Sequence, residues 1–220
     1  MAGHHVQVKI CGLCRPDDVE SAIVAGAAYI GFVFYPRSPR SLSSVEAQSL
    51  ARRAGDTRKV ALFVDANDHE IDEIVTAIEP DLLQLHGNET PERVAAIRRR
   101  FAIPVMKAVG VRTKGDLDVA GTYLDVVDQL LLDAKPEPDD SLMPGGNGIG
   151  FDWHLLEGWG SPIPWMLAGG LNPGNVREAV RISGAQQVDV SSGVESAPGM
   201  KSAQLMMQFV EQADGGAHAE

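Results

Sequence analysis

The stretch Val6-Gln7-Val8-Lys9-Ile10-Cys11-Gly12 begins as an apolar strand pattern and ends in a cysteine and a glycine. Side chains alternate between the two faces of a strand, so Lys9 and Cys11 are expected to share one face. A helix is predicted over residues 16–25, because Pro16 suits a first helical turn and the acidic residues after it suit the positive end of a helix. The stretch is therefore interpreted as the start of a strand–helix unit.

The same alternation of short apolar runs and amphipathic stretches continues along the chain. Seven more strands are predicted, over residues 29–34, 59–64, 81–85, 103–108, 126–132, 163–168 and 187–190. Helices are predicted near residue 44, over 69–78, 90–100 and 113–120, near 151, and over 173–182 and 201–212. A proline- and glycine-rich loop over residues 134–150 and a frayed tail over 214–220 complete the prediction.

Eight strands, each followed by a helix or helical turn, predict an α/β fold with a parallel sheet and helices outside it. In 220 residues this favours a single-domain (β/α)8 TIM barrel over residues 1–220. The alternative is a doubly wound open sheet. That fold usually has a glycine fingerprint after its first strand, and Gly12-Leu13-Cys14-Arg15 does not match one.

Composition excludes several classes of function. The formal net charge is -11 and the isoelectric point is about 4.9, so nucleic acid and anionic membranes are poor partners. No apolar run approaches the roughly 18 residues of a membrane span, and the N-terminus has no signal-peptide pattern. Cys11 and Cys14 are the only cysteines, which is typical of reduced thiols in the cytoplasm. A zinc site would need further ligands, so no metal is expected.

Two turns near the C-terminus are rich in small residues. Gly169 and Gly170 follow the seventh predicted strand, and Ser191, Ser192 and Gly193 follow the eighth. In a (β/α)8 barrel these positions often bind phosphate, because backbone N–H groups and a short helix N-terminus point at the anion. The other interpretation is that the glycines only permit tight turns. We favour the phosphate site, because both turns occur at the usual positions.

Cys11 and Asp133 end the first and sixth predicted strands, which lie across the barrel mouth from each other. A thiolate can remove a proton and a protonated carboxyl can donate one, so the pair can act as general base and general acid. The charge of Lys9 is expected to lower the thiol pKa, and burial of Asp133 to favour its protonated form. The alternatives are a small buried hydrophobe for Cys11 and a cap or turn for Asp133.

Four other polar residues lie near predicted strand ends. Asp189 interrupts an apolar run on the strand expected beside the first, and is predicted to pair with Lys9 mainly for structural reasons. Arg37 and Arg40 lie in a loop over the mouth of the barrel, where they could contact a substrate. The alternative is that both are solvated surface arginines. His86 is first interpreted as a satisfied polar residue at a strand end.

Several motifs in order resemble one family, phosphoribosylanthranilate isomerase of tryptophan biosynthesis, from Val8 to about Lys201. They are Lys9-Ile10-Cys11-Gly12, Gly31-Phe32-Val33-Phe34-Tyr35-Pro36, Gln84-Leu85-His86-Gly87, Leu131-Leu132-Asp133, Gly150-Phe151-Asp152-Trp153, Gly169-Gly170-Leu171-Asn172-Pro173 and Val188-Asp189-Val190-Ser191-Ser192-Gly193-Val194-Glu195. The sequence departs from the family pattern at Cys14, where threonine is usual, and at Ile149-Gly150, where a lysine or other polar residue is common.

The resemblance implies a cofactor-independent Amadori rearrangement. N-(5′-phosphoribosyl)anthranilate would become 1-(2-carboxyphenylamino)-1-deoxyribulose 5-phosphate, with Cys11 as base, Asp133 as acid and Arg40 holding the anthranilate carboxylate. The turns at Gly169-Gly170 and Ser192-Gly193 would bind the phosphate. His86, Asp189 and Ser191 are also expected to contribute to the substrate site. The expected partner is this small phosphosugar–anthranilate, bound by a monomer or homodimer.

Three other functions remain open at this stage. A metal-dependent sugar-phosphate epimerase would need ligands at several strand ends. An aminoaldose isomerase of histidine biosynthesis resembles this chain, but that family implies an aspartate where this chain has Cys11. A barrel that binds without catalysis would need no acid–base pair.

Overall fold

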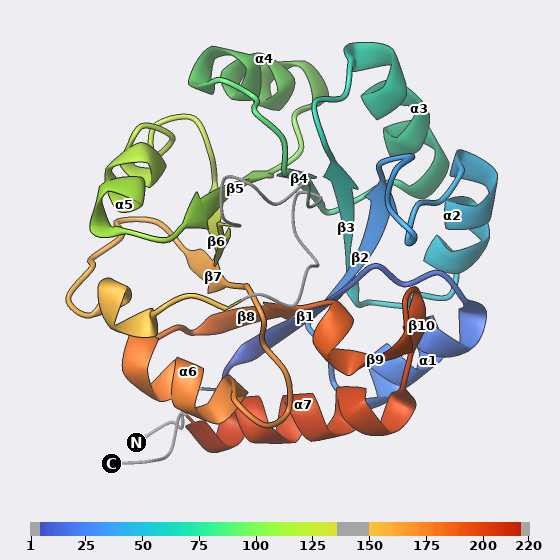
Figure 1. The fold of residues 1–220 in the computed structure, drawn as a ribbon. Helices are drawn as coiled ribbons and strands as arrows, with labels where there is room; N and C mark the ends of the chain where they lie inside the picture. The colour runs from blue at the N-terminus through green and yellow to red at the C-terminus, as the bar shows by residue number, and fades with distance from the viewer. Residues whose placement is uncertain (1–4, 136–149, 217–220) are drawn as a thin grey trace.

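Eight parallel strands close into a barrel in the computed structural model, which describes residues 5–135 and 150–216 (Figure 1). The strands are β1 (Gln7–Cys11), β2 (Tyr29–Phe34), β3 (Arg58–Phe63), β4 (Leu82–Leu85), β5 (Val105–Val111), β6 (Gln129–Ala134), β7 (Trp165–Leu167) and β8 (Gln187–Val190). β1 pairs with β8 in a register that places Lys9 beside Asp189. The predicted (β/α)8 barrel is therefore confirmed, and the open sheet is wrong.

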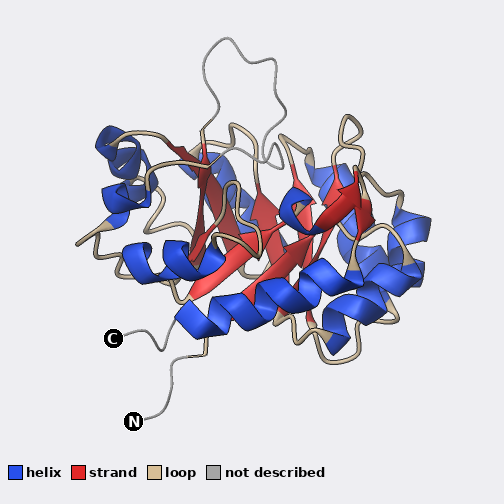
Figure 2. Cartoon of the chain, turned by 60° about the horizontal axis from the view of Figure 1, so that its bottom comes forward, coloured by secondary structure: helices blue, strands red, loops and turns tan. Residues whose placement is uncertain are grey.

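Helices surround the strands on the outside of the barrel (Figure 2). They are α1 (Pro16–Val24), α2 (Ser44–Ala51), α3 (Asp68–Ile78), α4 (Pro91–Phe101), α5 (Lys114–Gly121), α6 (Val176–Ser183) and α7 (Ala203–Gly216). Thr90 caps α4: its side chain accepts a hydrogen bond from Arg93 N, and Pro91 is the first helical residue. In the described part of the chain, no helix is long and apolar enough to cross a membrane.

The unit after β6 differs from the expected helix. The element is the 3₁₀ turn η1 (Trp153–Leu156), in which the Asp152 side chain accepts a hydrogen bond from His154 N. Most of the predicted loop over 134–150 lies outside the described residues, apart from its two ends.

The last two helices begin later than predicted. α6 begins at Val176 because Asn172 Oδ1 accepts from Gly174 N and Asn175 Oδ1 accepts from Asn172 N, which holds residues 172–175 in a turn. α7 begins after a small antiparallel hairpin, β9 (Glu195–Ala197) and β10 (Met200–Lys201), that follows the 3₁₀ turn η2 (Ser192–Val194).

The prediction that the tail over 214–220 is frayed is wrong for its first residues. α7 continues to Gly216, and Asp214 Oδ1 accepts a hydrogen bond from Val6 N at 3.2 Å. This contact ties the end of α7 to the chain just before β1. Residues 217–220 lie outside the described residues.

The apolar core has two layers. The larger lies between strands and helices and includes helix residues such as Leu50, Ile71 and Val94. A smaller cluster consists mainly of strand residues and fills the barrel interior: Tyr29, Val60, Leu82, Met106, Ala108, Leu131, Met166 and Ala168. The side chains at the carboxyl ends of the strands lie directly above this packed interior.

Candidate active site

The predicted acid and base both face the barrel interior. Asp133 is two residues after Leu131, a member of the interior cluster, so it shares that inward face. Cys11 shares the inward face of Lys9, whose register partner Tyr29 belongs to the same cluster. Both side chains end their strands at the carboxyl end of the barrel, where barrel enzymes carry their sites.

Cys11 is only 4% exposed and lies close to the Lys9 ammonium. A Cβ placed on Gly31 would lie 2.9 Å from Cys11 Sγ and 3.2 Å from Lys9 Nζ. The absence of a side chain at this position of β2 therefore makes room for the sulfur and the ammonium side by side.

Lys9 is fully buried and forms the predicted ion pair with Asp189, with 2.8 Å between Nζ and Oδ1. Burial alone would lower the pKa of Lys9, but the Asp189 carboxylate and the Cys11 sulfur raise it above its ordinary value. Lys9 is thus a permanent cation inside the barrel. A buried charge without such a partner would be strongly destabilising.

The expected effect of Lys9 on the thiol is not the dominant one. Burial raises the pKa of Cys11, and the nearby Asp189 carboxylate adds to this, while Lys9 opposes both without outweighing them. The expectation of a thiol pKa below its ordinary value is wrong for the substrate-free protein. Cys11 is therefore a neutral thiol at neutral pH until something else favours the thiolate.

This shift predicts when the thiolate forms. In a Cys14→Ser variant without substrate, we expect the ultraviolet absorbance of the Cys11 thiolate to develop only above pH about 8.5, the ordinary value for a thiol. The Cys11→Ser, Cys14→Ser double variant gives the background from tyrosine ionisation. Full thiolate absorbance at pH 7 would contradict the shift.

Arg40 is buried beside Cys11, and the alternative of a solvated surface arginine is wrong for it. Gly12, at φ +77°, lies directly under its side chain: a Cβ there would collide with Arg40 Cδ. Arg40 Nε and Nη2 donate to the two carboxylate oxygens of Glu195 at 2.7 and 2.8 Å. Arg37, in the same loop, is exposed.

Glu195 and Lys201 belong to this cluster and were not predicted as site residues. Lys201 Nζ donates to Glu195 Oε1 at 2.7 Å and to the backbone oxygen of Ser191 at 3.0 Å. Burial opposes ionisation of Glu195, but Arg40 and Lys201 hold its pKa below the ordinary value. Two basic side chains, Arg40 and Lys201, thus surround one carboxylate. Burial lowers the pKa of Lys201, and the Glu195 carboxylate opposes that shift without outweighing it.

The two predicted anion-binding turns pack against each other. Gly169 and Gly170 have φ values of +90° and +65°, and a Cβ on Gly169 would lie 2.6 Å from Ala134 N at the end of β6. A Cβ on Gly193 would collide with the carbonyl oxygen of Leu171. The turns after β7 and β8 therefore approach one another through backbone, which only glycine allows.

This contact makes Gly193→Ala a specific test of the turn. The methyl group would meet a backbone carbonyl, so the turn must shift, and we expect the free energy of unfolding to fall by about 1–3 kcal/mol. Urea denaturation measures the change. Gly160→Ala is the matched control, since nothing lies within 4 Å of a Cβ there. Equal stability of the two variants would contradict the packing described.

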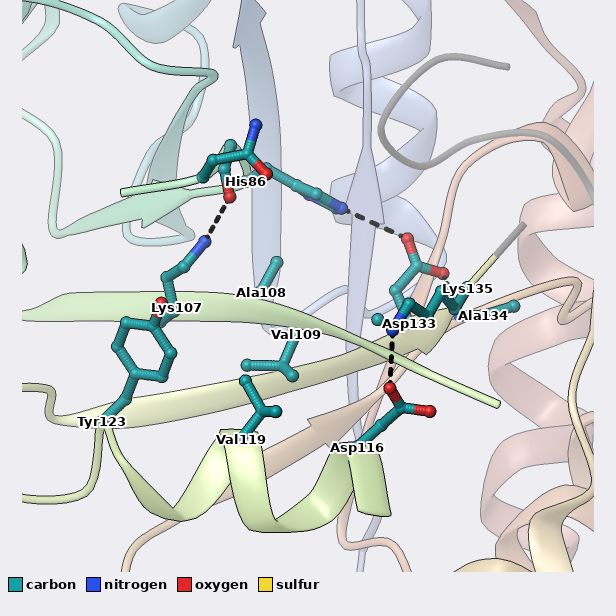
Figure 3. A pocket seen from close by; sticks show the side chains of 13 residues that line it. His86, Lys107, Ala108, Val109, Asp116, Val119, Tyr123, Asp133, Ala134 and Lys135 are labelled. Carbon is teal, nitrogen blue, oxygen red and sulfur yellow. Dashed lines mark hydrogen bonds and ion pairs between the residues drawn. The ribbon is translucent and has the colours of Figure 1, made fainter. Parts of the chain in front are cut away.

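Asp133 is held by His86, whose interpretation as a polar residue satisfied at a strand end omits this contact. His86 Nε2 lies 3.3 Å from Asp133 Oδ2 (Figure 3). Asp133 Oδ1 accepts a hydrogen bond from Ala134 N at 2.8 Å. On its other side, His86 Nδ1 lies 2.9 Å from Nε2 of Gln84. Gln84 was not predicted, although its position two residues before His86 places both on one face of the strand.

A pocket of about 400 Å³ opens beside this pair, over the ends of β4, β5 and β6 (Figure 3). Its two lysines are already paired: Lys107 with Glu89 at 2.9 Å and Lys135 with Asp116 at 2.6 Å. Among the described residues, no group of three or more His, Cys, Asp or Glu side chains converges as a metal site would require.

A closed parallel barrel with polar side chains gathered at the carboxyl ends of its strands defines a barrel enzyme. The family model for N-(5'phosphoribosyl)anthranilate (PRA) isomerase matches residues 8–212. The chain belongs to this family, which confirms the resemblance seen in the sequence.

Curated relatives match over nearly the whole chain. N-(5'-phosphoribosyl)anthranilate isomerase of Paramagnetospirillum magneticum is 54% identical over 214 residues, covering 96% of this chain and 98% of the relative. The enzyme of the same name from Rhizobium meliloti is 52% identical over 206 residues, covering 93% and 95%.

Solved structures agree. Phosphoribosyl anthranilate isomerase of Thermotoga maritima has a TM-score of 0.86 at 35% identity, covering 96% of this chain and 99% of that one. A phosphoribosyl anthranilate isomerase in complex with reduced 1-(o-carboxyphenylamino)-1-deoxyribulose 5-phosphate has a TM-score of 0.83 at 34% identity, with the same coverage.

Proposed function

We propose that this protein catalyses the Amadori rearrangement of N-(5′-phosphoribosyl)anthranilate to 1-(2-carboxyphenylamino)-1-deoxyribulose 5-phosphate in tryptophan biosynthesis. Family membership supports the reaction. The observation that carries it here is the pair of inward-facing groups at the barrel mouth: the Cys11 thiol beside Lys9, and the Asp133 carboxyl beside His86.

The proposed first step uses Asp133 as general acid. Its carboxyl donates a proton to the ribose ring oxygen, the bond between C1′ and that oxygen breaks, and an iminium cation forms at C1′. The resulting carboxylate is stabilised where it stands, since it accepts hydrogen bonds from Ala134 N and, at longer range, from His86.

The proposed second step uses Cys11 as general base. The iminium makes the C2′ proton acidic, and the thiolate removes it to give an enolamine. Protonation of the enolamine at C1′ and loss of the proton on the 2′-hydroxyl then give the ketone. Burial disfavours the thiolate, but the Lys9 ammonium and the new iminium charge both favour it. The thiolate is therefore most populated when the ring has opened.

We propose that the phosphate binds at Gly169, Gly170, Ser191, Ser192 and Gly193. The close packing of the two turns supports this, since it brings their backbone N–H groups to one edge of the mouth. Lys201 supports it from behind by donating to both the backbone oxygen and Oγ of Ser191. Asp189 contributes through Lys9, which it holds in place.

We propose that Arg40 holds the anthranilate carboxylate. Its bond to Glu195 uses Nε and Nη2, so Nη1 is the guanidinium nitrogen with no hydrogen bond among the described residues. Glu195 orients the guanidinium, and Lys201 Nζ holds Glu195 from the other side at 2.7 Å.

Arg40→Ala should therefore raise KM for phosphoribosylanthranilate by about 10- to 100-fold, the effect of losing a charged hydrogen bond of about 1.5–3 kcal/mol. kcat should change much less, because the carboxylate is remote from the reacting carbons. Arg37→Ala, an exposed arginine of the same loop, is the control. An unchanged KM in Arg40→Ala would exclude Arg40 as the carboxylate ligand.

The test of the whole proposal is a fluorescence assay of the loss of phosphoribosylanthranilate, made in situ because the compound is labile. Activity that is unchanged by EDTA would separate this reaction from that of a metal-dependent epimerase.

We also propose a cytoplasmic location. The predicted oligomeric state, monomer or homodimer, stays a prediction.

A further inference from the structure

Gln84 is a fully buried polar residue that no step of the proposed mechanism uses. It lies on β4, where its register partner is Met106 of the interior cluster, so its side chain faces into the barrel. Its Nε2 donates toward His86 Nδ1 at 2.9 Å, and its Oε1 is buried with no hydrogen-bond partner in the described part of the structure. A buried amide oxygen left unpaired is destabilising, so a role in the site is worth seeking.

The amide fixes which ring nitrogen of His86 carries the hydrogen. An N–H of Gln84 needs a lone pair on Nδ1, so the hydrogen must lie on Nε2, which faces Asp133 Oδ2 at 3.3 Å. Turning the Gln84 amide by 180° would offer Oε1 to Nδ1 instead. It would also leave the two N–H donors where Oε1 now finds no partner, and buried N–H groups without partners are rarer than such oxygens.

The orientation also bears on where an added proton resides. The His86–Asp133 pair can carry one extra proton as imidazolium and carboxylate, or as neutral imidazole and carboxylic acid. Imidazolium has an N–H at both ring positions, and its Nδ1–H would point at the N–H of Gln84. The donor of Gln84 therefore disfavours imidazolium, so His86 faces Asp133 as a neutral ring with its hydrogen on Nε2.

The charged groups around the pair do not reverse this preference. Lys107 and Lys135 line the same pocket, but each is paired with a carboxylate, Glu89 and Asp116 respectively. Neither carboxylate is then free to stabilise an imidazolium as a counter-ion.

We propose that Gln84 is a positioning residue that keeps His86 neutral, with its hydrogen on Nε2, so that His86 donates a hydrogen bond to the Asp133 carboxylate that forms when the ribose ring opens. This rests on the proposed function, in which Asp133 is the general acid. Each turnover moves a proton from the Asp133 carboxyl to the ribose ring oxygen, and a proton from solvent restores the acid.

The direct test is the tautomer of His86 in the substrate-free full chain, measured by long-range ¹H–¹⁵N correlation of the histidine rings. A His86→Asn variant assigns its signals among the six histidines. At pH 7 we expect a neutral ring with the hydrogen on Nε2. A ring protonated on Nδ1, or on both nitrogens, would overturn the proposal.

Gln84→Glu tests the cause. Its carboxylate would accept an Nδ1–H, so we expect a doubly protonated His86 at pH 7 and a kcat at least tenfold lower, with KM within about twofold. Gln84→Met keeps a similar volume and removes the donor, so we expect signals of both tautomers and a smaller fall in kcat. If Gln84→Glu does not fold, the wild-type spectrum and the Gln84→Met spectrum still show whether Gln84 fixes the tautomer of His86.

The matched control is Gln129→Glu, which places a carboxylate at another buried glutamine. Gln129 begins β6 and donates to Gln187 Oε1, at the opposite end of the strand from Asp133. It should leave the His86 signals and kcat unchanged. A neutral His86 in Gln84→Glu would overturn the inference, whereas full turnover in Asp133→Asn would overturn the proposed function and leave the tautomer result standing.

Discussion

Replacing Cys11 by serine is expected to reduce kcat by about 10²–10⁴-fold, the usual contribution of a positioned general base. A serine hydroxyl has nearly the same size but is a far weaker acid than a thiol, so an anion at this position becomes inaccessible even beside Lys9. The fold should be retained, because Cys11 belongs to a small apolar cluster with Val33 and Leu62, separate from the two larger clusters of the core. The measurement is steady-state turnover of phosphoribosylanthranilate, with circular dichroism to confirm the fold.

Cys14→Ser is the matched control for this change. Cys14 is only partly buried, and its Sγ lies 3.5 Å from the backbone oxygen of Arg40, outside the acid–base pair. Its kcat should stay close to that of the wild type. Wild-type kcat in Cys11→Ser would remove Cys11 as the base.

Asp133→Asn is expected to have a loss of similar size. The amide is nearly isosteric, and its oxygen can still accept the hydrogen bond from Ala134 N. It cannot donate a proton to the ribose ring oxygen, so ring opening loses its acid. We expect kcat to fall by about 10²–10⁴-fold with little change in KM, because the interaction is made in the transition state.

Asp116→Asn separates this effect from a general effect of neutralising a carboxylate in the same pocket. Burial opposes ionisation of Asp116, but Lys135 and the backbone N–H groups of Arg112 and Thr113 hold its pKa well below the ordinary value. The variant should therefore lose stability above the ordinary carboxyl pKa and keep its kcat. Similar kcat values in the Asp116 and Asp133 variants would contradict the assignment of Asp133 as the acid.

The fold could be predicted because its signals are local. Each strand is a short apolar run, and the alternation with amphipathic helices admits few topologies. Closure of the barrel then predicts that Asp189 lies beside Lys9, which is the register found. The errors at the starts of α6 and α7 come from hydrogen bonds of Asn172 and from the hairpin of Glu195, which local helix propensity does not describe.

The site could be predicted only in part, because the orientation and the pKa values of its residues depend on contacts between residues far apart in the sequence. Glu195 reaches Arg40 across 155 positions of sequence, and no local pattern announces that pair. The pKa of Cys11 depends on complete burial, which outweighs the one neighbouring charge that the sequence makes visible. The strand periodicity predicts that Gln84 shares a face with His86, but the role of Gln84 follows only from its 2.9 Å contact with His86.

The most direct test of the account is the decay of phosphoribosylanthranilate fluorescence with three purified proteins: wild type, Cys11→Ser and Asp133→Asn. We expect rapid decay with the wild type, unaffected by EDTA, and decay about 10²–10⁴-fold slower with either variant. No decay with the wild type, or wild-type decay with either variant, would contradict the claim that a thiol and a carboxyl at the barrel mouth carry out this isomerisation.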